Sequence, residues 1–198
     1  VPEMTRALLI VLALFTPLQT PADDPLREWA VFARGNGARQ LTAWMRCVAL
    51  GKLTGAECER AVPAGLPLYH GKLGLFVTFI KGAKVRGCYG AFHHKSDDAS
   101  LTLKEYVAGA LYADPRHTPP DIAELEDTTI VLTVADEPVS VDDINRVDFS
   151  RYGLMIYFET GERLVLVPSE IRNRDRLETI LRSGTVAQCA AFRAVTIR

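Results

Sequence analysis

A cysteine set among glycines, two residues after an arginine, is the part of this sequence with the clearest chemical potential. The segment reads Arg86-Gly87-Cys88-Tyr89-Gly90. Glycines beside a thiol let another backbone or a ligand approach closely. A nearby guanidinium favours the thiolate, which is the nucleophilic form of cysteine. Cys88 is therefore a candidate catalytic nucleophile, and Arg86 is a candidate for holding an anionic group.

Two other roles for Cys88 stay open at this stage. A free cysteine is often buried and packs as a small hydrophobic residue. The chain also contains Cys47, Cys58 and Cys189, so a disulfide is a further option. Accessibility and the pKa of the thiol separate the chemical role from the packing role.

Positive side chains near this segment define a candidate site for an anionic ligand. A planar guanidinium suits a carboxylate or a phosphate. The alternative is that the two arginines form structural ion pairs with acids such as Asp114 or Glu124. The candidate ligand-binding residues are Arg86, Gly87, Gly90, Arg116 and His117.

The adjacent pair His93-His94 raises the question of a metal. A site that joins it to Cys88 or His117 is conceivable, because imidazole and thiolate suit zinc or copper. Adjacent side chains on a strand point to opposite faces, however, which argues against joint coordination. A CxxC pair, a P-loop and a GxGxxG fingerprint are all missing from the sequence. We therefore predict neither a metal nor a cofactor.

Two β-hairpins are expected to position these residues. Residues 74–92 read as two strands around a Lys-Gly-Ala-Lys turn, and residues 152–167 as a second hairpin closed at Gly161. Strands joined by hairpins, with helices set apart, predict an α+β fold: an antiparallel β-sheet with flanking helices. The helices are expected at 25–33, 37–50, 101–112 (capped by Ser100) and 171–182, and further strands at 128–135 and 190–197.

The first 22 residues are typical of a secretory signal peptide. Met4-Thr5-Arg6 is short and positive, residues 7–15 are apolar, and residues 16–22 end in Thr-Pro-Ala. The apolar run is too short for a stable membrane span, which takes about 20 residues. We predict a signal peptide over 1–22, one domain over 23–198, and export to the periplasm or the exterior. A buried N-terminal helix is the alternative.

Charge and cysteine content agree with an exported soluble domain. The formal net charge of −1 provides no field for nucleic acid. Disulfides persist in oxidising compartments, and four cysteines allow three full pairings. Cys47 lies near an expected helix end and Cys58 follows a glycine-containing loop, so we predict a disulfide between them.

Several segments resemble the AMMECR-type domain family, and they do so in the family's order. Residues 74–92, GLFVTFIKGAKVRGCYGAF, are similar to its hairpin pattern GVFVTL…LRGCIGTF. Residues 108–119, AGALYADPRHTP, resemble its alanine-rich helix and D-P-R-F-x-P turn. Residues 152–171 resemble its second hairpin, and the likeness extends over residues 26–190. The chain departs from the pattern at Tyr89, Ala91, His117 and Ser169-Glu170.

The resemblance implies an α+β fold with a larger and a smaller lobe around a cleft. The family has no settled biochemical role, and its domain is associated in many prokaryotic genomes with Memo-like and radical-SAM proteins, which are therefore possible partners. We expect a cleft binding module for a small anionic ligand or a partner, because no general base is visible beside the thiol. The alternative is a thiol-dependent enzyme that uses Cys88 as its nucleophile.

Overall fold

A computed structural model describes residues 24–67, 73–171 and 174–198 of the chain. The predicted signal peptide, residues 1–22, lies outside these residues. The fold is α+β, as predicted. Its elements in chain order are α1 (Arg27–Phe32), α2 (Asn36–Thr54), β1 (Gly74–Lys81), β2 (Lys84–Ala91), α3 (Ala99–Tyr112), α4 (Ile122–Leu125), β3 (Thr129–Ala135), β4 (Val139–Ser140), η2 (Ile144–Arg146, a 3₁₀ turn), β5 (Tyr152–Phe158), β6 (Arg163–Leu166), α5 (Arg174–Arg182) and β7 (Val186–Ile197).

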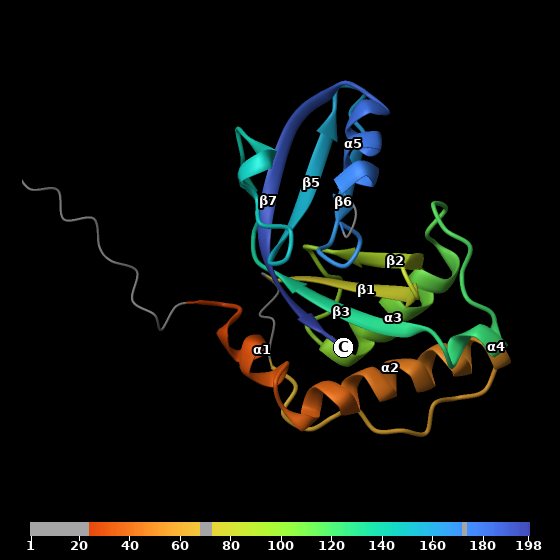
Figure 1. Ribbon diagram of the computed structural model, residues 1–198. Coiled ribbons are helices and arrows are strands. Elements are labelled where there is room, and N and C mark those ends of the chain that lie inside the picture. Colours follow the sequence, from red (N-terminus) through yellow and green to blue (C-terminus); the bar gives the residue numbers. More distant parts are fainter. Residues whose placement is uncertain (1–23, 68–72, 172–173) are drawn as a thin grey trace, which may run out of the picture.

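One long strand, β7, connects two lobes (Figure 1). The described strands follow the order β2-β1-β3-β7-β5-β6, and every pairing is antiparallel. Residues 186–193 of β7 pair with β5, while residues 194–197 pair with β3. The short strand β4 also pairs with β7. The larger lobe therefore holds β1, β2, β3 and α1–α4, and the smaller lobe holds β4, β5, β6 and α5.

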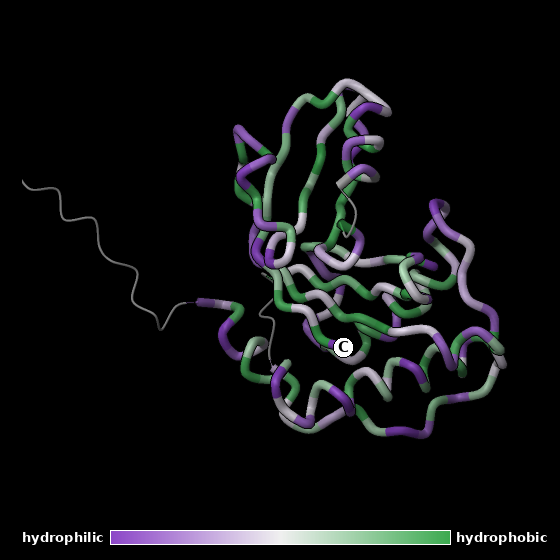
Figure 2. The backbone as a smooth tube through the Cα atoms, viewed as in Figure 1, coloured by the Kyte–Doolittle hydropathy of each residue, from purple (hydrophilic) through white to green (hydrophobic). Residues whose placement is uncertain are grey.

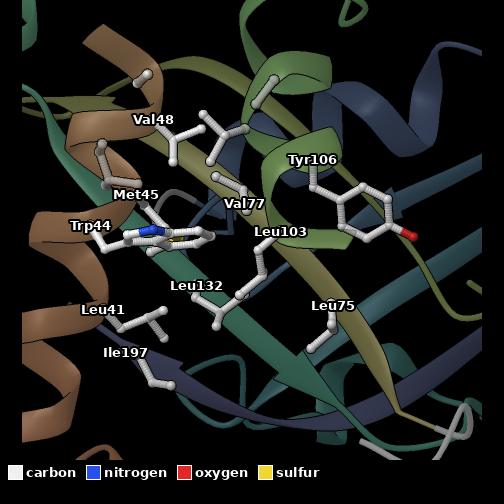
Figure 3. Close-up of a cluster of buried hydrophobic side chains, with 14 of the residues drawn as sticks. Leu41, Trp44, Met45, Val48, Leu75, Val77, Leu103, Tyr106, Leu132 and Ile197 are labelled. Atoms are coloured by element: carbon white, nitrogen blue, oxygen red, sulfur yellow. The ribbon is translucent and has the colours of Figure 1, made fainter. Parts of the chain in front are cut away.

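The larger lobe is built around the buried strand β1, and its main core lies between the sheet and the helices α2 and α3 (Figure 3). Strand side chains alternate between faces, so Leu75, Val77 and Phe79 point toward the helices. Helix α2 contributes Trp44 and Met45 to this core, both almost completely buried. Its buried apolar residues recur at helical spacing and pack in the same core as β1. Hydrophobic and hydrophilic residues alternate along the tube of α2 (Figure 2).

The smaller lobe has a helix on only one face of its sheet. Leu154 and Ile156 of β5 pack with Leu166 of β6 and Leu177 of α5. The intervening residues of β5 point to the opposite face, because side chains alternate along a strand. This second face carries no helix in the part of the chain that the structure describes, and its Met155 and Tyr157 share a cleft with Phe76 and Phe92 of the larger lobe.

The predicted disulfide between Cys47 and Cys58 is confirmed. Their Cα atoms lie 5.4 Å apart, and the bond ties the segment after α2 back onto that helix.

The prediction of Ser100 as a helix cap was wrong. The side chain of Asp98 instead accepts hydrogen bonds from the backbone N–H groups of Ser100 and Leu101, so α3 begins at Ala99, two residues earlier than expected. Within the described residues, none of the helices combines the length and the apolar character that a membrane crossing requires.

Candidate functional site

The thiol of Cys88 lies inside the molecule, on the face of β2 that points away from α3. Cys88 pairs with Thr78 of β1, whose hydroxyl donates a hydrogen bond of 3.2 Å to the sulfur. Its backbone N–H donates a 2.8 Å hydrogen bond to the carboxylate of Asp114. Only 7% of the residue is exposed to solvent. The thiol therefore packs at the junction of the lobes, against Phe76 and Val167.

The surroundings of Cys88 disfavour its thiolate. Burial raises the pKa of the Cys88 thiol well above its ordinary value, and the negative charge of Glu170 raises it further. The expectation that Arg86 lowers this pKa is wrong, because Arg86 points elsewhere. A β-bulge places both Val85 and Arg86 opposite Ile80 of β1, which breaks the two-residue alternation that would put Arg86 on the face of the thiol.

Arg86 is held by Glu124 of α4 and by the backbone just before it. Its Nη1 and Nη2 atoms donate to the two carboxylate oxygens of Glu124 at 2.8 and 2.7 Å. Its Nε and Nη2 atoms also donate to the carbonyl oxygens of Thr118 and Pro119. The hydrogen bonds from Arg86 and Lys81 lower the pKa of Glu124 to about 2. The alternative interpretation, a structural ion pair with Glu124, is thus confirmed for Arg86.

Arg116 joins two acids, one from each lobe. Its Nε atom lies 2.8 Å from Oδ1 of Asp114, and its Nη2 atom lies 3.4 Å from Oε1 of Glu170. The Asp114 and Glu170 side chains are 3% and 1% exposed, so both carboxylates are buried. Burial opposes ionisation of Asp114, but the hydrogen bonds from Arg116 and from the Cys88 N–H outweigh it and lower its pKa. Burial raises the pKa of Glu170, and Arg116 only partly offsets this effect.

The glycines of the segment permit close packing of β2. A Cβ atom on Gly87 would lie 2.0 Å from the carbonyl oxygen of Ala110, so β2 rests directly on α3 at this point. A Cβ atom on Gly90 would lie 2.1 Å from the carbonyl oxygen of Leu75. Gly87 therefore serves the packing of the larger lobe. Gly90 also lines a cleft, described below.

His93, His94 and His117 lie in different surroundings. The ring of His94 lies between the hydroxyl of Tyr106 and the carbonyl oxygen of Leu73, 2.7 Å from each. His93 is exposed, and His117 is half-buried in the turn that follows Asp114. Among the residues that the structure describes, histidine, cysteine and acidic side chains nowhere gather in a group of three that suits a metal ion.

An open cleft of about 850 Å³ lies between the lobes. The larger lobe supplies the end of β2 and the residues that follow it, and the smaller lobe supplies the helix-free face of β5 and β6. Cross-strand pairing explains the second wall: Met155 lies opposite Val165, and Tyr157 lies opposite Arg163. The lining residues are Phe76, Gly90, Ala91, Phe92, His93, Glu137, Pro138, Met155, Tyr157, Arg163 and Val165.

Two aromatic rings of the larger lobe, those of Phe76 and Phe92, line this cleft. Phe76 and Phe92 meet edge to face with ring centroids 5.2 Å apart, and both contact Phe192 of β7. Because β7 belongs to both lobes, this aromatic group lies where the lobes meet. Cys88 packs against Phe76 but does not line the cleft.

Comparison with known proteins identifies the family. The model of the AMMECR1 family matches residues 46–194, which include both hairpins and the turn that carries Arg116. This chain belongs to the AMMECR1 family. The family resemblance expected from the sequence is thereby confirmed.

Relatives of this AMMECR1-family chain are found in bacteria and archaea. A protein from Thermotoga maritima is 29% identical over 161 residues, covering 81% of this chain and 83% of its own length. A protein from Methanococcoides burtonii is 31% identical over 116 residues, covering 54% of this chain and 56% of its own length. The crystal structure of the uncharacterized protein PH0010 from Pyrococcus horikoshii shares the fold, with a TM-score of 0.57, 18% identity and coverage of 81% of this chain and 89% of that one.

Three residues of this AMMECR1-family site were not singled out as functional from the sequence. Glu170 is a buried acid beside the thiol, and Arg163 and Glu137 are exposed charges in the cleft. A signal for Arg163 existed: a hairpin closed at Gly161 places residue 163 opposite residue 157, on the same face of the sheet. The placement of Glu137 and Glu170 depends on how the lobes meet, which no local pattern encodes.

Proposed function

We propose that this protein is a ligand-binding module that takes a small ligand with an acidic group into the cleft between its lobes. The cleft has the size of a small-molecule site, for which about 300–1,000 Å³ is usual. Most of its lining residues are apolar or aromatic, but His93, Glu137 and Arg163 add polar and charged groups, so polar and apolar atoms share its surface about equally. The observation that carries the proposal is the presence of Arg163 beside the apolar and aromatic residues of this cleft.

Arg163 is the arginine best suited to hold the ligand's anion. Arg86 and Arg116 already serve carboxylates of the protein itself, whereas Arg163 makes no ion pair within residues 24–67, 73–171 and 174–198. A guanidinium beside an apolar wall binds a carboxylate or phosphate while the body of the ligand covers the aromatic rings. The imidazole of His93, on the same cleft, is a second hydrogen-bonding group for the anion.

Isothermal titration calorimetry with 3-phenylpropionate tests this proposal, because that compound combines an aromatic body with one carboxylate. Binding by the wild type and a loss of affinity of about fivefold or more in Arg163→Gln are expected. The control is Arg151→Gln, which removes an exposed arginine outside the cleft. Equal affinities in Arg163→Gln and wild type, or no binding at all, would count against the proposal.

A thiol-dependent enzyme is less well supported. A nucleophilic cysteine requires access for its substrate and a pKa low enough to form the thiolate. Cys88 is buried, its pKa is raised, and it lies outside the cleft. These observations favour the packing role of the thiol over the catalytic one.

We also propose that the protein is exported. The order of charged, apolar and small residues in the first 22 positions supports this, and so does the Cys47–Cys58 disulfide, since such bonds persist in oxidising compartments. Expression in a bacterial host followed by N-terminal sequencing of the periplasmic fraction should give a chain that begins near Asp23. An uncleaved chain found only in the cytosol would refute export.

A further inference from the structure

The cleft is lined by one acidic side chain, Glu137, and one basic side chain, Arg163, and the two do not form an ion pair with each other. Glu137 follows β3 at the junction of the lobes, and Arg163 begins β6. Both are exposed, and neither forms an ion pair within the described residues 24–67, 73–171 and 174–198. The neighbouring Asp136 behaves differently, because its carboxylate binds Arg193 at 2.6 Å. The fold thus neutralises Asp136 and leaves Glu137 to face the cleft.

Unpaired charges of opposite sign on one cleft are best satisfied by a ligand that carries both charges. Electrostatic complementarity decides which ligands are accepted, since like charges facing one another are strongly unfavourable. A ligand with only a carboxylate would satisfy Arg163 but would also meet the carboxylate of Glu137. A ligand with an ammonium group in addition turns Glu137 from a repulsive group into an attractive one.

The size of the cleft favours a ligand whose two charges are well separated. The carboxylate of Glu137 and the guanidinium of Arg163 are not within ion-pair distance of each other, so the ligand must bridge them. In a single amino acid the ammonium and the carboxylate sit on the same carbon atom. Each added residue separates the two ends by up to about 3.5 Å, and a cleft of about 850 Å³ is large enough for more than one residue.

We propose that the ligand is a short apolar peptide with free ends, whose ammonium group binds Glu137 and whose carboxylate binds Arg163. Its side chains cover the wall formed by Phe76, Phe92 and Tyr157. This inference rests on the proposed function, because it assigns a ligand class to the same cleft. It goes beyond that function by giving Glu137 a role in preferring ligands that also carry an ammonium group, while a simple acid still binds through Arg163, only more weakly.

Four matched peptides and three proteins test the assignment. The peptides are Phe-Phe with both ends free, N-acetyl-Phe-Phe without the ammonium, Phe-Phe-amide without the carboxylate, and N-acetyl-Phe-Phe-amide without either. The proteins are wild type, Glu137→Gln and Arg163→Gln, and the readout is affinity from calorimetry. Both substitutions lie at exposed positions, so the fold should tolerate them.

The expected pattern is specific to each charge. Wild type should bind the free dipeptide about fivefold or more tightly than either singly blocked form. Glu137→Gln should weaken the free dipeptide and the amide but not the acetylated acid. Arg163→Gln should weaken the free dipeptide and the acetylated acid but not the amide.

Two outcomes would overturn the inference, and they differ in what they leave standing. If N-acetyl-Phe-Phe and 3-phenylpropionate bind through Arg163 and the free ammonium adds nothing, the peptide assignment fails and the proposed function survives. If neither 3-phenylpropionate nor any of the four peptides binds at millimolar concentration, both fail.

Discussion

The guanidinium of Arg116 lies 3.4 Å from the buried carboxylate of Glu170, and this ion pair joins the larger lobe to the smaller one. The same guanidinium also binds Asp114, whose second oxygen accepts the backbone N–H of Cys88. The segment that carries the candidate thiol is therefore part of the contact between the lobes. The polar groups around Cys88 hold the two halves of the molecule in place, and the cleft lies beside them.

Replacing Arg116 should destabilise the protein markedly. Arg116→Gln leaves the buried carboxylates of Asp114 and Glu170 without their common partner, which should cost about 2–4 kcal/mol in the free energy of unfolding. Arg146→Gln is the matched control, because the Arg146 side chain is 88% exposed and its ion pair with Asp143 lies at the surface; its loss should cost less than about 0.5 kcal/mol. Urea unfolding followed by circular dichroism measures both. Equal effects of the two substitutions would show that the buried pair contributes little.

Glu170 should make its own contribution to the pH dependence of stability. Burial raises the pKa of Glu170 above the ordinary value of 4.5, and repulsion from the Asp114 carboxylate raises it further. The positive charge of Arg116 opposes these effects only in part. The folded state therefore holds the proton more tightly than the unfolded state. The resulting stabilisation is complete below pH of about 4.5 and is lost as the pH rises through the folded-state pKa.

The comparison that isolates this effect is wild type against Glu170→Gln, which has no titrating group at that position. The stability of wild type relative to the variant should be higher at about pH 4 than at about pH 8. Urea unfolding at both values gives the difference directly. A difference that does not change with pH, or that changes in the opposite direction, contradicts the raised pKa.

The pH dependence of stability that comes from Glu124 should have the opposite sign to that from Glu170. Its pKa is lowered to about 2 by hydrogen bonds from Arg86 and Lys81, so its contribution to stability is present above pH of about 4.5 and is lost as the pH falls toward 2. Glu124→Gln should therefore lose less stability than wild type over this acid range. Glu178→Gln, which removes an exposed helical ion pair with Arg182, is the control. Identical acid profiles for wild type and Glu124→Gln would exclude the strong interaction with Arg86.

The thiol of Cys88 should be unreactive in the native protein. Because it is buried and its pKa is raised, iodoacetamide at about pH 7 should label it only after denaturation. Arg86→Ala should not alter the rate, because Arg86 binds Glu124 and not the thiol. Mass spectrometry of tryptic peptides measures the labelling. Rapid native alkylation of Cys88 that slows in Arg86→Ala would restore the nucleophile hypothesis.

Much of the local structure could be predicted because its causes lie within a few residues of one another. The hairpin of β1 and β2 follows from an apolar run, a glycine-containing turn and a returning strand. The Cys47–Cys58 disulfide joins residues 11 positions apart, so a helix end and a short loop were sufficient to suggest it. The cap of α3 was not predicted correctly, however, because Asp98 caps this helix and not Ser100.

The sequence by itself determined the family and the antiparallel α+β fold, and it left two roles open for Arg86 and Arg116, anion binding or ion pairs with nearby acids. Only the tertiary structure decided what those residues do. A bulge of one residue in β2 turned Arg86 away from Cys88, and such an irregularity depends on the partner strand. The burial of Glu170 against Arg116, and the cleft that holds both Glu137 and Arg163, arise where segments distant in sequence meet. Their cause is the docking of one lobe on the other through β7, and no window of sequence contains that contact.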